Sequence, residues 1–154
     1  MSKITFVNPP LTIEERYGVK HQSGGQTPPL GLTHLAAVCR KHGFETGIID
    51  ATVYSSDYNT TLEKIIANSP DYVGVTAAAI SIDNADRLAR MIKKTTGNIR
   101  IIVGGPHITA VPEETMERYQ SIDIGVIGEG EVTIIELLNT LEKGSNLGEV
   151  KGII

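Results

Sequence analysis

Residues 100–107 read Arg-Ile-Ile-Val-Gly-Gly-Pro-His, a short β-branched run that ends in two glycines. A nearly continuous apolar run of this length is typical of a parallel strand that is buried on both faces. The two glycines permit a sharp turn directly after the strand. Further runs of the same kind occur on both sides of this segment, and the sequence predicts a strand at each. The predicted strands are Ile4–Val7, Thr46–Asp50, Tyr72–Val75, Arg100–Val103 and Asp123–Ile127.

Helical patterns lie between and after these strands. Their apolar residues recur with the i, i+3, i+4, i+7 spacing that marks one face of a helix. Alternating strands and helices indicate an α/β protein with a parallel sheet and right-handed crossovers. We therefore predict a doubly wound, flavodoxin-like or Rossmann-like sheet of five strands in the order 2-1-3-4-5, with helices on both faces. The helical positions are Leu32, Leu35, Ala36 and Cys39; Leu62, Ile65 and Ile66; Ala85, Leu88, Ala89 and Ile92; and Ile134, Leu137, Leu138 and Leu141.

Length and composition narrow the function classes. The chain has 154 residues, the usual size of one domain. Lys and Arg number 14 and Asp and Glu 18, and this balance argues against nucleic acid as a partner. The sequence has neither an apolar run long enough to cross a membrane nor a signal peptide, so we expect a cytoplasmic protein without a membrane partner. Cys39 is the only cysteine, and its place on a helical apolar stripe predicts a buried thiol rather than a metal ligand.

A ligand site is expected at the carboxyl ends of the strands, where the strand order reverses between strands 1 and 3. The loops at this edge are rich in glycine and other small residues, which leave room for a ligand. Turn chemistry, close helix packing and the helix dipole are the simpler explanations of the same residues. The loop that begins at Asn8 and runs to about Thr27 is far longer than usual, so it is either a cover for the site or a plain loop. The candidate binding residues are Asn8, Pro9, Pro10, Thr76, Ala77, Ala78, Gly104, Gly105, Pro106, His107, Gly128, Glu129, Gly130 and Glu131.

Several segments together resemble one known family. They are Asn8–Pro10, Pro28–Ala37, His42–Glu45, Asp50–Ala51, Val103–His107 and Gly128–Glu131. Their order and spacing resemble the cobalamin-binding domain that precedes the catalytic domain of class B radical-SAM proteins. That family includes methyltransferases and the anaerobic magnesium-protoporphyrin ester cyclase type. The resemblance runs from Lys3 to about Gly144 and implies cobalamin as the cofactor.

The resemblance also implies how cobalamin would lie. Its nucleotide tail would enter a slot lined by Gly104, Gly105 and the Thr76–Ala79 loop. The corrin would face Asn8–Pro10, the long loop and Gly128–Glu131. Many cobalamin domains carry Asp-x-His-x-x-Gly after strand 1, with the histidine on cobalt, whereas this chain has Asn-Pro-Pro there. Within the long loop, His21 is a weak candidate for the cobalt ligand in place of that histidine.

The leading hypothesis is a cofactor-binding module of a larger radical-SAM enzyme of the methyltransferase or oxidative cyclase type. Residues 1–144 would form the module, and 145–154 would begin a connection to a C-terminal radical-SAM domain. A 4Fe-4S cluster, S-adenosylmethionine and the small-molecule substrate would belong to that domain, because this chain lacks Cys-x-x-x-Cys-x-x-Cys. The segment 150–154 is predicted to start another strand, with an edge strand or a frayed tail as alternatives. The alternative functions are a degenerate domain that binds only protein, and a nucleotide- or flavin-binding oxidoreductase.

Overall fold

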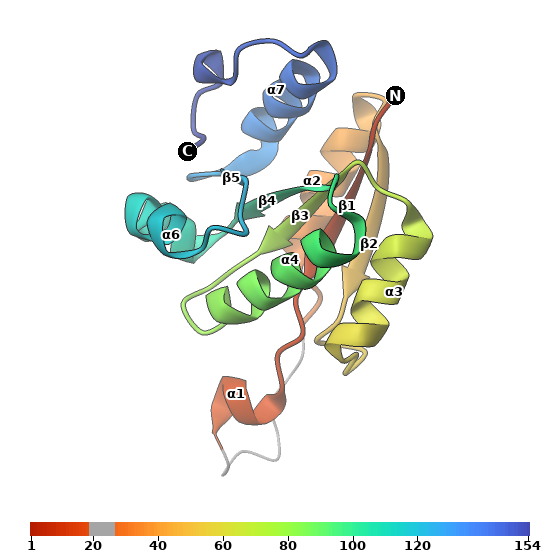
Figure 1. Ribbon diagram of the computed structural model, residues 1–154, viewed down its shortest axis with the longest axis vertical. Coiled ribbons are helices and arrows are strands. Elements are labelled where there is room, and N and C mark those ends of the chain that lie inside the picture. The colour runs from red at the N-terminus through yellow and green to blue at the C-terminus, as the bar shows by residue number, and fades with distance from the viewer. Residues whose placement is uncertain (19–26) are drawn as a thin grey trace.

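The sheet of the computed structural model has five parallel strands in the order β2-β1-β3-β4-β5 (Figure 1). The structure describes residues 1–18 and 27–154. The predicted fold class and strand order are confirmed. Because each strand reaches its neighbour through a crossover, all carboxyl ends lie at one edge of the sheet. The strands are β1 (Lys3–Asn8), β2 (Glu45–Asp50), β3 (Tyr72–Thr76), β4 (Arg100–Gly104) and β5 (Ile124–Gly125).

Two pairs of helices cover the two faces of the sheet. Helices α3 (Tyr58–Asn68) and α4 (Ile82–Thr96) cover one face, which we call the closed face. Helices α2 (Leu30–Lys41) and α7 (Gly130–Lys143) cover the other, which we call the open face. Each face has its own apolar core. Most predicted helical positions point into these cores, but Ile66 is exposed at the edge of α3.

Strand β5 (Ile124–Gly125) is shorter than the predicted Asp123–Ile127, and the last residues of the chain pair with its outer edge. The amide of Gly125 donates to the carbonyl of Ile154 at 2.7 Å, and the amide of Ile154 donates back at 2.9 Å. The amide of Ile127 likewise donates to the carbonyl of Gly152 at 2.9 Å, while the amide of Val126 donates to Val103 of β4 at 2.8 Å. The segment at 150–154 is thus an antiparallel edge partner of β5, and a connection to a further domain stays a prediction.

Shorter helices stand at the ends of the strands. Helices α5 (Pro106–Ala110) and α6 (Pro112–Arg118) follow β4, and the 3-10 helix η1 (Leu147–Glu149) follows α7. Helix α1 (Ile13–Tyr17) projects beyond the carboxyl edge of the sheet (Figure 1). Among the described residues, no helix is long and apolar enough to cross a membrane.

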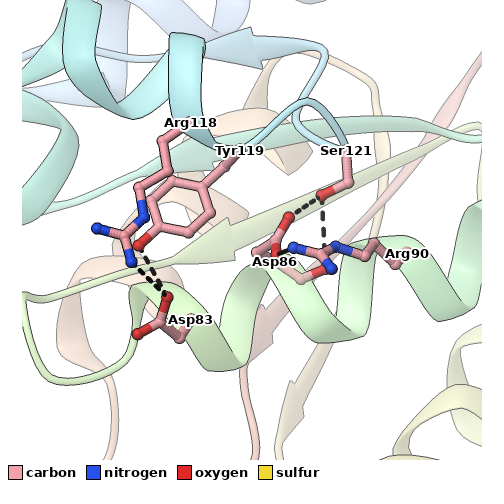
Figure 2. Close-up of polar contacts among 6 residues, drawn as sticks. All are labelled: Asp83, Asp86, Arg90, Arg118, Tyr119 and Ser121. Atoms are coloured by element: carbon pink, nitrogen blue, oxygen red, sulfur yellow. Dashed lines mark hydrogen bonds and ion pairs between the residues drawn. The ribbon is translucent and has the colours of Figure 1, made fainter.

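A network of polar side chains links α4, on the closed face, to the segment that precedes β5 (Figure 2). The carboxylate of Asp86 is buried; it accepts a hydrogen bond from the Ser121 hydroxyl at 2.6 Å and pairs with Arg90. One turn earlier, Asp83 accepts a hydrogen bond from the Tyr119 hydroxyl at 2.8 Å. Burial raises the pKa of Tyr119, and its bond to Asp83 raises it further, so the phenol keeps the proton that it donates. The network fixes α4 to the segment between α6 and β5.

Candidate functional site

A slot opens on the open face at the carboxyl edge of the sheet. Its volume is ≈ 180 Å³, and it lies between the strands and the first turns of α2 and α7. Glycines and apolar side chains make up most of its surface. The lining residues are Phe6, Gly31, Leu32, Leu35, Gly74, Val75, Thr76, Ile102, Gly104, Gly105, Val126, Gly128, Glu129, Gly130, Glu131 and Ile134.

The slot is open because several positions in its walls are glycines, which carry no side chain. Gly74 lies in the middle of β3, and a Cβ there would meet the Phe6 ring at 2.9 Å. A Cβ on Gly104 would meet nothing closer than Val126 at 3.9 Å, so this position faces free space. A Cβ on Gly130 would approach Leu35 at 3.3 Å, which lets α7 start close to α2. Larger residues at these positions would narrow or fill the slot.

A second hollow of ≈ 220 Å³ lies at the ends of β1 and β3, where the strand order reverses. Thr76 lines this hollow and the slot, so the two are neighbours along the same edge. The second hollow is more polar than the slot and includes one cation, Arg16. Its lining residues are Asn8, Leu11, Arg16, Thr27, Pro28, Pro29, Thr52, Thr76, Ala78, Ile80, Ser81 and Pro106.

Hydrogen bonds hold the Asn8-Pro9-Pro10 turn rigidly beside the second hollow. The side-chain amide of Asn8 donates to the Asp50 carboxylate at 3.0 Å. The carbonyl of Pro9 accepts from the Thr52 hydroxyl at 3.1 Å, and that of Pro10 from the Asn84 side chain at 2.8 Å. Both prolines are buried. Asn8 can therefore face a ligand, while the prolines support the turn from beneath.

The loops after β3 and β4 are locked together at Gly105. Its φ is 110°, and a Cβ would lie 2.8 Å from the carbonyl oxygen of Ala77. The amide of Ala77 donates to Gly104, and the amide of His107 donates to Ala77. Since a side chain at 105 would collide with backbone, this position requires glycine. Ala77 is fully buried beneath the contact.

The start of α7 forms the mouth of the slot. Gly128 has a φ of 76°, and its amide donates to the Thr109 hydroxyl at 3.0 Å. The Glu131 carboxylate lies 3.2 Å from Nδ1 of His34 on α2, so the two side chains meet across the mouth. Glu129 is exposed beside them. The start of α7 thus supplies both acidic side chains among the described lining residues of the slot, Glu129 and Glu131.

The structure brings most of the predicted site residues to this edge but divides them differently. Gly128 to Glu131 line the slot, with Thr76, Gly104 and Gly105, and their place beside the corrin stays a prediction. Asn8, Ala78 and Pro106 line the second hollow. Pro9, Pro10, Ala77 and His107 line neither. The ring of His107 instead packs edge-on against Tyr119, with centroids 6.5 Å apart.

Sequence analysis missed the deep residues of the slot. Phe6, Ile102 and Val126 look like ordinary strand residues, and nothing in the sequence marks them as lining a cavity. Gly74 did carry a signal, because a glycine inside a β-branched strand marks close approach of another group. In the long loop, Thr12 and Glu15 form the capping box that starts α1, a pattern that can be read from sequence.

The site is built for holding a ligand. No histidine lines either hollow among residues 1–18 and 27–154, and no set of three or more metal-ligating side chains gathers in that part of the chain. His21 and the middle of the long loop lie outside the described residues. The slot is mostly apolar, and the neighbouring second hollow carries more polar side chains. Apart from Arg16, the polar side chains among the described lining residues carry amides, hydroxyls and carboxylates.

The model of the B12 binding domain matches residues 18–138 of this chain. The chain belongs to the B12-binding domain family. An uncharacterised methyltransferase of Pyrococcus horikoshii is 36% identical over 152 residues, which cover 99% of this chain and 31% of that protein. The anaerobic magnesium-protoporphyrin IX monomethyl ester cyclase of Rubrivivax gelatinosus is 30% identical over 121 residues, which cover 78% of this chain and 22% of that protein.

A solved structure agrees with the sequence relatives. The cobalamin-dependent S-adenosylmethionine radical enzyme OxsB, with aqua-cobalamin and S-adenosylmethionine bound, superposes with a TM-score of 0.81 at 25% identity. The match covers 99% of this chain and 20% of OxsB. The chain thus spans about a third or less of the length of these proteins. The predicted family and cobalamin as the cofactor are confirmed, and the family match sets aside the nucleotide- or flavin-binding alternative.

Proposed function

We propose that this domain holds cobalamin with its nucleotide tail in the slot and its corrin over the second hollow. The observation that carries the proposal is the slot, which runs from the carboxyl edge down to Gly74 in the middle of β3. A long narrow tail fits such a space, and small residues at the edge allow a flat ring to approach the backbone. The second hollow, with Asn8, Ala78 and Pro106, would lie beneath the corrin.

The residues of this chain position and shield the cofactor. Bound cobalamin supplies a cobalt centre that can carry a methyl group or electrons. The apolar walls of the slot exclude water from the tail, and the locked Gly105 and Asn8 turns fix the edge on which the corrin would rest. Because no described histidine lines the site, we propose that cobalt has no ligand from the described part of this chain.

We also propose that this domain is part of a larger enzyme. The relatives named above are an uncharacterised methyltransferase, a cyclase and a radical-SAM enzyme, and each is several times longer than the match. We propose that residues 1–144 form the cobalamin module and that 145–154 lead to a radical-SAM domain. That domain would carry the 4Fe-4S cluster, S-adenosylmethionine and the small-molecule substrate. A cytoplasmic location stays a prediction.

Visible spectroscopy tests the proposed function directly. The protein is mixed with hydroxocobalamin, and free ligand is removed by gel filtration. We expect the protein fraction to carry the corrinoid spectrum. Colourless protein would overturn the proposal and would favour a domain that binds only protein partners.

A slot-filling variant locates the binding site. Gly104→Val places three carbons in the free space beside Val126, on a strand that favours β-branched residues. We expect the dissociation constant of hydroxocobalamin to rise roughly tenfold or more, since overfilling such a space costs about 1–3 kcal/mol. Ala67→Val adds two carbons and the same β-branched side chain on the exposed surface of α3 and should leave binding unchanged. Equal affinities for both variants would place the tail elsewhere.

A further inference from the structure

The walls of the slot differ sharply from its mouth in polarity. The deep side chains are all apolar, and they come from β1, β4, α2, α7 and the end of β5. Thr76, Glu129 and Glu131 are the only polar side chains among the described lining residues, and both glutamates stand at the start of α7. The apolar side chains that form the walls are Phe6, Leu32, Leu35, Ile102, Val126 and Ile134.

The backbone beneath the slot offers no free polar group either. Phe6, Gly74 and Ile102 occupy matching register positions on the three adjacent strands β1, β3 and β4. Their amides and carbonyls are directed along the sheet, where parallel strands bond to each other. A group that reaches this floor therefore meets an aromatic ring and aliphatic carbon. A polar atom carried there would lose its water without gaining a partner.

We propose that the slot selects corrinoids by their lower base and prefers dimethylbenzimidazole to a purine. This inference rests on the proposed function, since it assumes that the tail enters the slot. The carbon edge and methyl groups of dimethylbenzimidazole match the aliphatic walls, and its ring can pack against Phe6. Adenine would bring an exocyclic amine and additional ring nitrogens to the same floor. Each buried polar group without a partner costs about 1–3 kcal/mol, so the purine form binds more weakly.

Three corrinoids separate this inference from the proposed function. Equilibrium dialysis of the protein, read by corrin absorbance, is carried out with cobalamin, with pseudocobalamin, which carries adenine, and with cobinamide, which has no base. We expect cobalamin to bind roughly tenfold or more tightly than pseudocobalamin. Equal binding of cobalamin and pseudocobalamin, both tighter than cobinamide, overturns the base preference but leaves the proposed function intact. If no corrinoid binds, both fail.

A matched pair of variants tests the walls themselves. Val126→Thr replaces a methyl of the wall with a hydroxyl of the same shape, which gives a polar base a partner. We expect the ratio of the two affinities, cobalamin over pseudocobalamin, to fall severalfold. Val132→Thr makes the same change on the exposed surface of α7 and should leave the ratio unchanged. A partial loss of folded protein lowers both affinities equally and therefore cancels in this ratio. An unchanged ratio in Val126→Thr would contradict the inference.

Discussion

The two faces of the sheet differ most clearly along β3, which presents valines to one and glycine to the other. Side chains alternate along a strand, so Val73 and Val75 point into the closed face and Gly74 lies on the open face. The closed face is filled by α3 and α4 and fixed by the buried carboxylate of Asp86 (Figure 2). The open face keeps a cavity at the edge. One five-residue strand thus supports stability on one side and ligand space on the other.

This difference has a physical basis in what each face must do. A closed core is stabilised by dispersion contacts and by the removal of apolar surface from water, and a void in it loses part of this stabilisation. A binding slot must leave apolar surface uncovered until the ligand arrives, which sacrifices part of that gain. We therefore expect most of the free energy of unfolding to depend on the closed face. Three predictions test this division, beginning with the largest effect, and a fourth concerns α1, outside both faces.

Truncating matched leucines on the two faces should give the largest contrast. Leu88 is fully buried on the closed face, so Leu88→Ala leaves a cavity and should lower the free energy of unfolding by about 3–5 kcal/mol. Leu35 lines the slot and is half-buried, so Leu35→Ala only widens an existing space and should cost about 1–2 kcal/mol. Urea denaturation measures both. Similar losses at the two positions would contradict the division.

The reactivity of the Cys39 thiol measures how well the apolar core beneath α2, on the open face, is protected from solvent. Burial raises its pKa to about 11. Very little thiolate therefore exists near pH 8, and we expect native Cys39 to react with a disulfide reagent on the order of a hundredfold more slowly than an exposed thiol. Ala37→Cys adds an exposed thiol on the same helix and should react first, as one rapid equivalent. Two rapid equivalents would show that the core around α2 opens freely.

Removing Asp86 should weaken the closed face by an intermediate amount. Asp86→Ala takes the acceptor from the Ser121 hydroxyl, which is buried, and leaves it with only a 3.4 Å contact to a backbone carbonyl. We expect the free energy of unfolding to fall by about 2 kcal/mol. Asp83→Ala breaks a more exposed contact to Tyr119 and should cost about 1 kcal/mol or less. The reverse order, measured by urea denaturation, would show that Asp86 contributes little.

The closed face was more predictable from sequence than the slot. Runs of Ile and Val and helical spacing identified the strands and the core of α4, because burial on a periodic element leaves a direct pattern. The strand order followed instead from the commonest arrangement of five such parallel strands. The slot depends on register: Phe6, Gly74 and Ile102 become neighbours only when three strands align. His107 was predicted from its place in a loop, yet its ring turns toward Tyr119. Side-chain direction after a turn leaves no periodic trace in sequence.

The smallest expected effect is on the stability of α1, which lies beyond both faces of the sheet. We expect acid to weaken α1 while leaving the two faces unchanged. Glu15 accepts a hydrogen bond from the Thr12 amide at 2.7 Å, and this bond is the main cause that lowers the pKa of Glu15 below its ordinary 4.5. A lowered pKa means that the carboxylate stabilises the folded helix above pH 4.5, and that this contribution is lost as the pH falls through the lowered value. Its size should not exceed about 1 kcal/mol, as for other exposed caps.

Amide NMR separates this local loss from unfolding of the sheet. The Thr12 amide should titrate with a midpoint below 4.5, while the Val73 amide in β3 keeps its shift. Glu15→Gln cannot ionise and should abolish the titration at Thr12 while leaving both faces unaffected. A Thr12 midpoint at or above 4.5 would contradict the role of the capping bond, and a Val73 shift that moves with the Thr12 shift would show that α1 is coupled to the sheet. The side chain of Asn84, which reaches Glu15 at 3.4 Å and Pro10 at 2.8 Å, is the contact through which such coupling would pass.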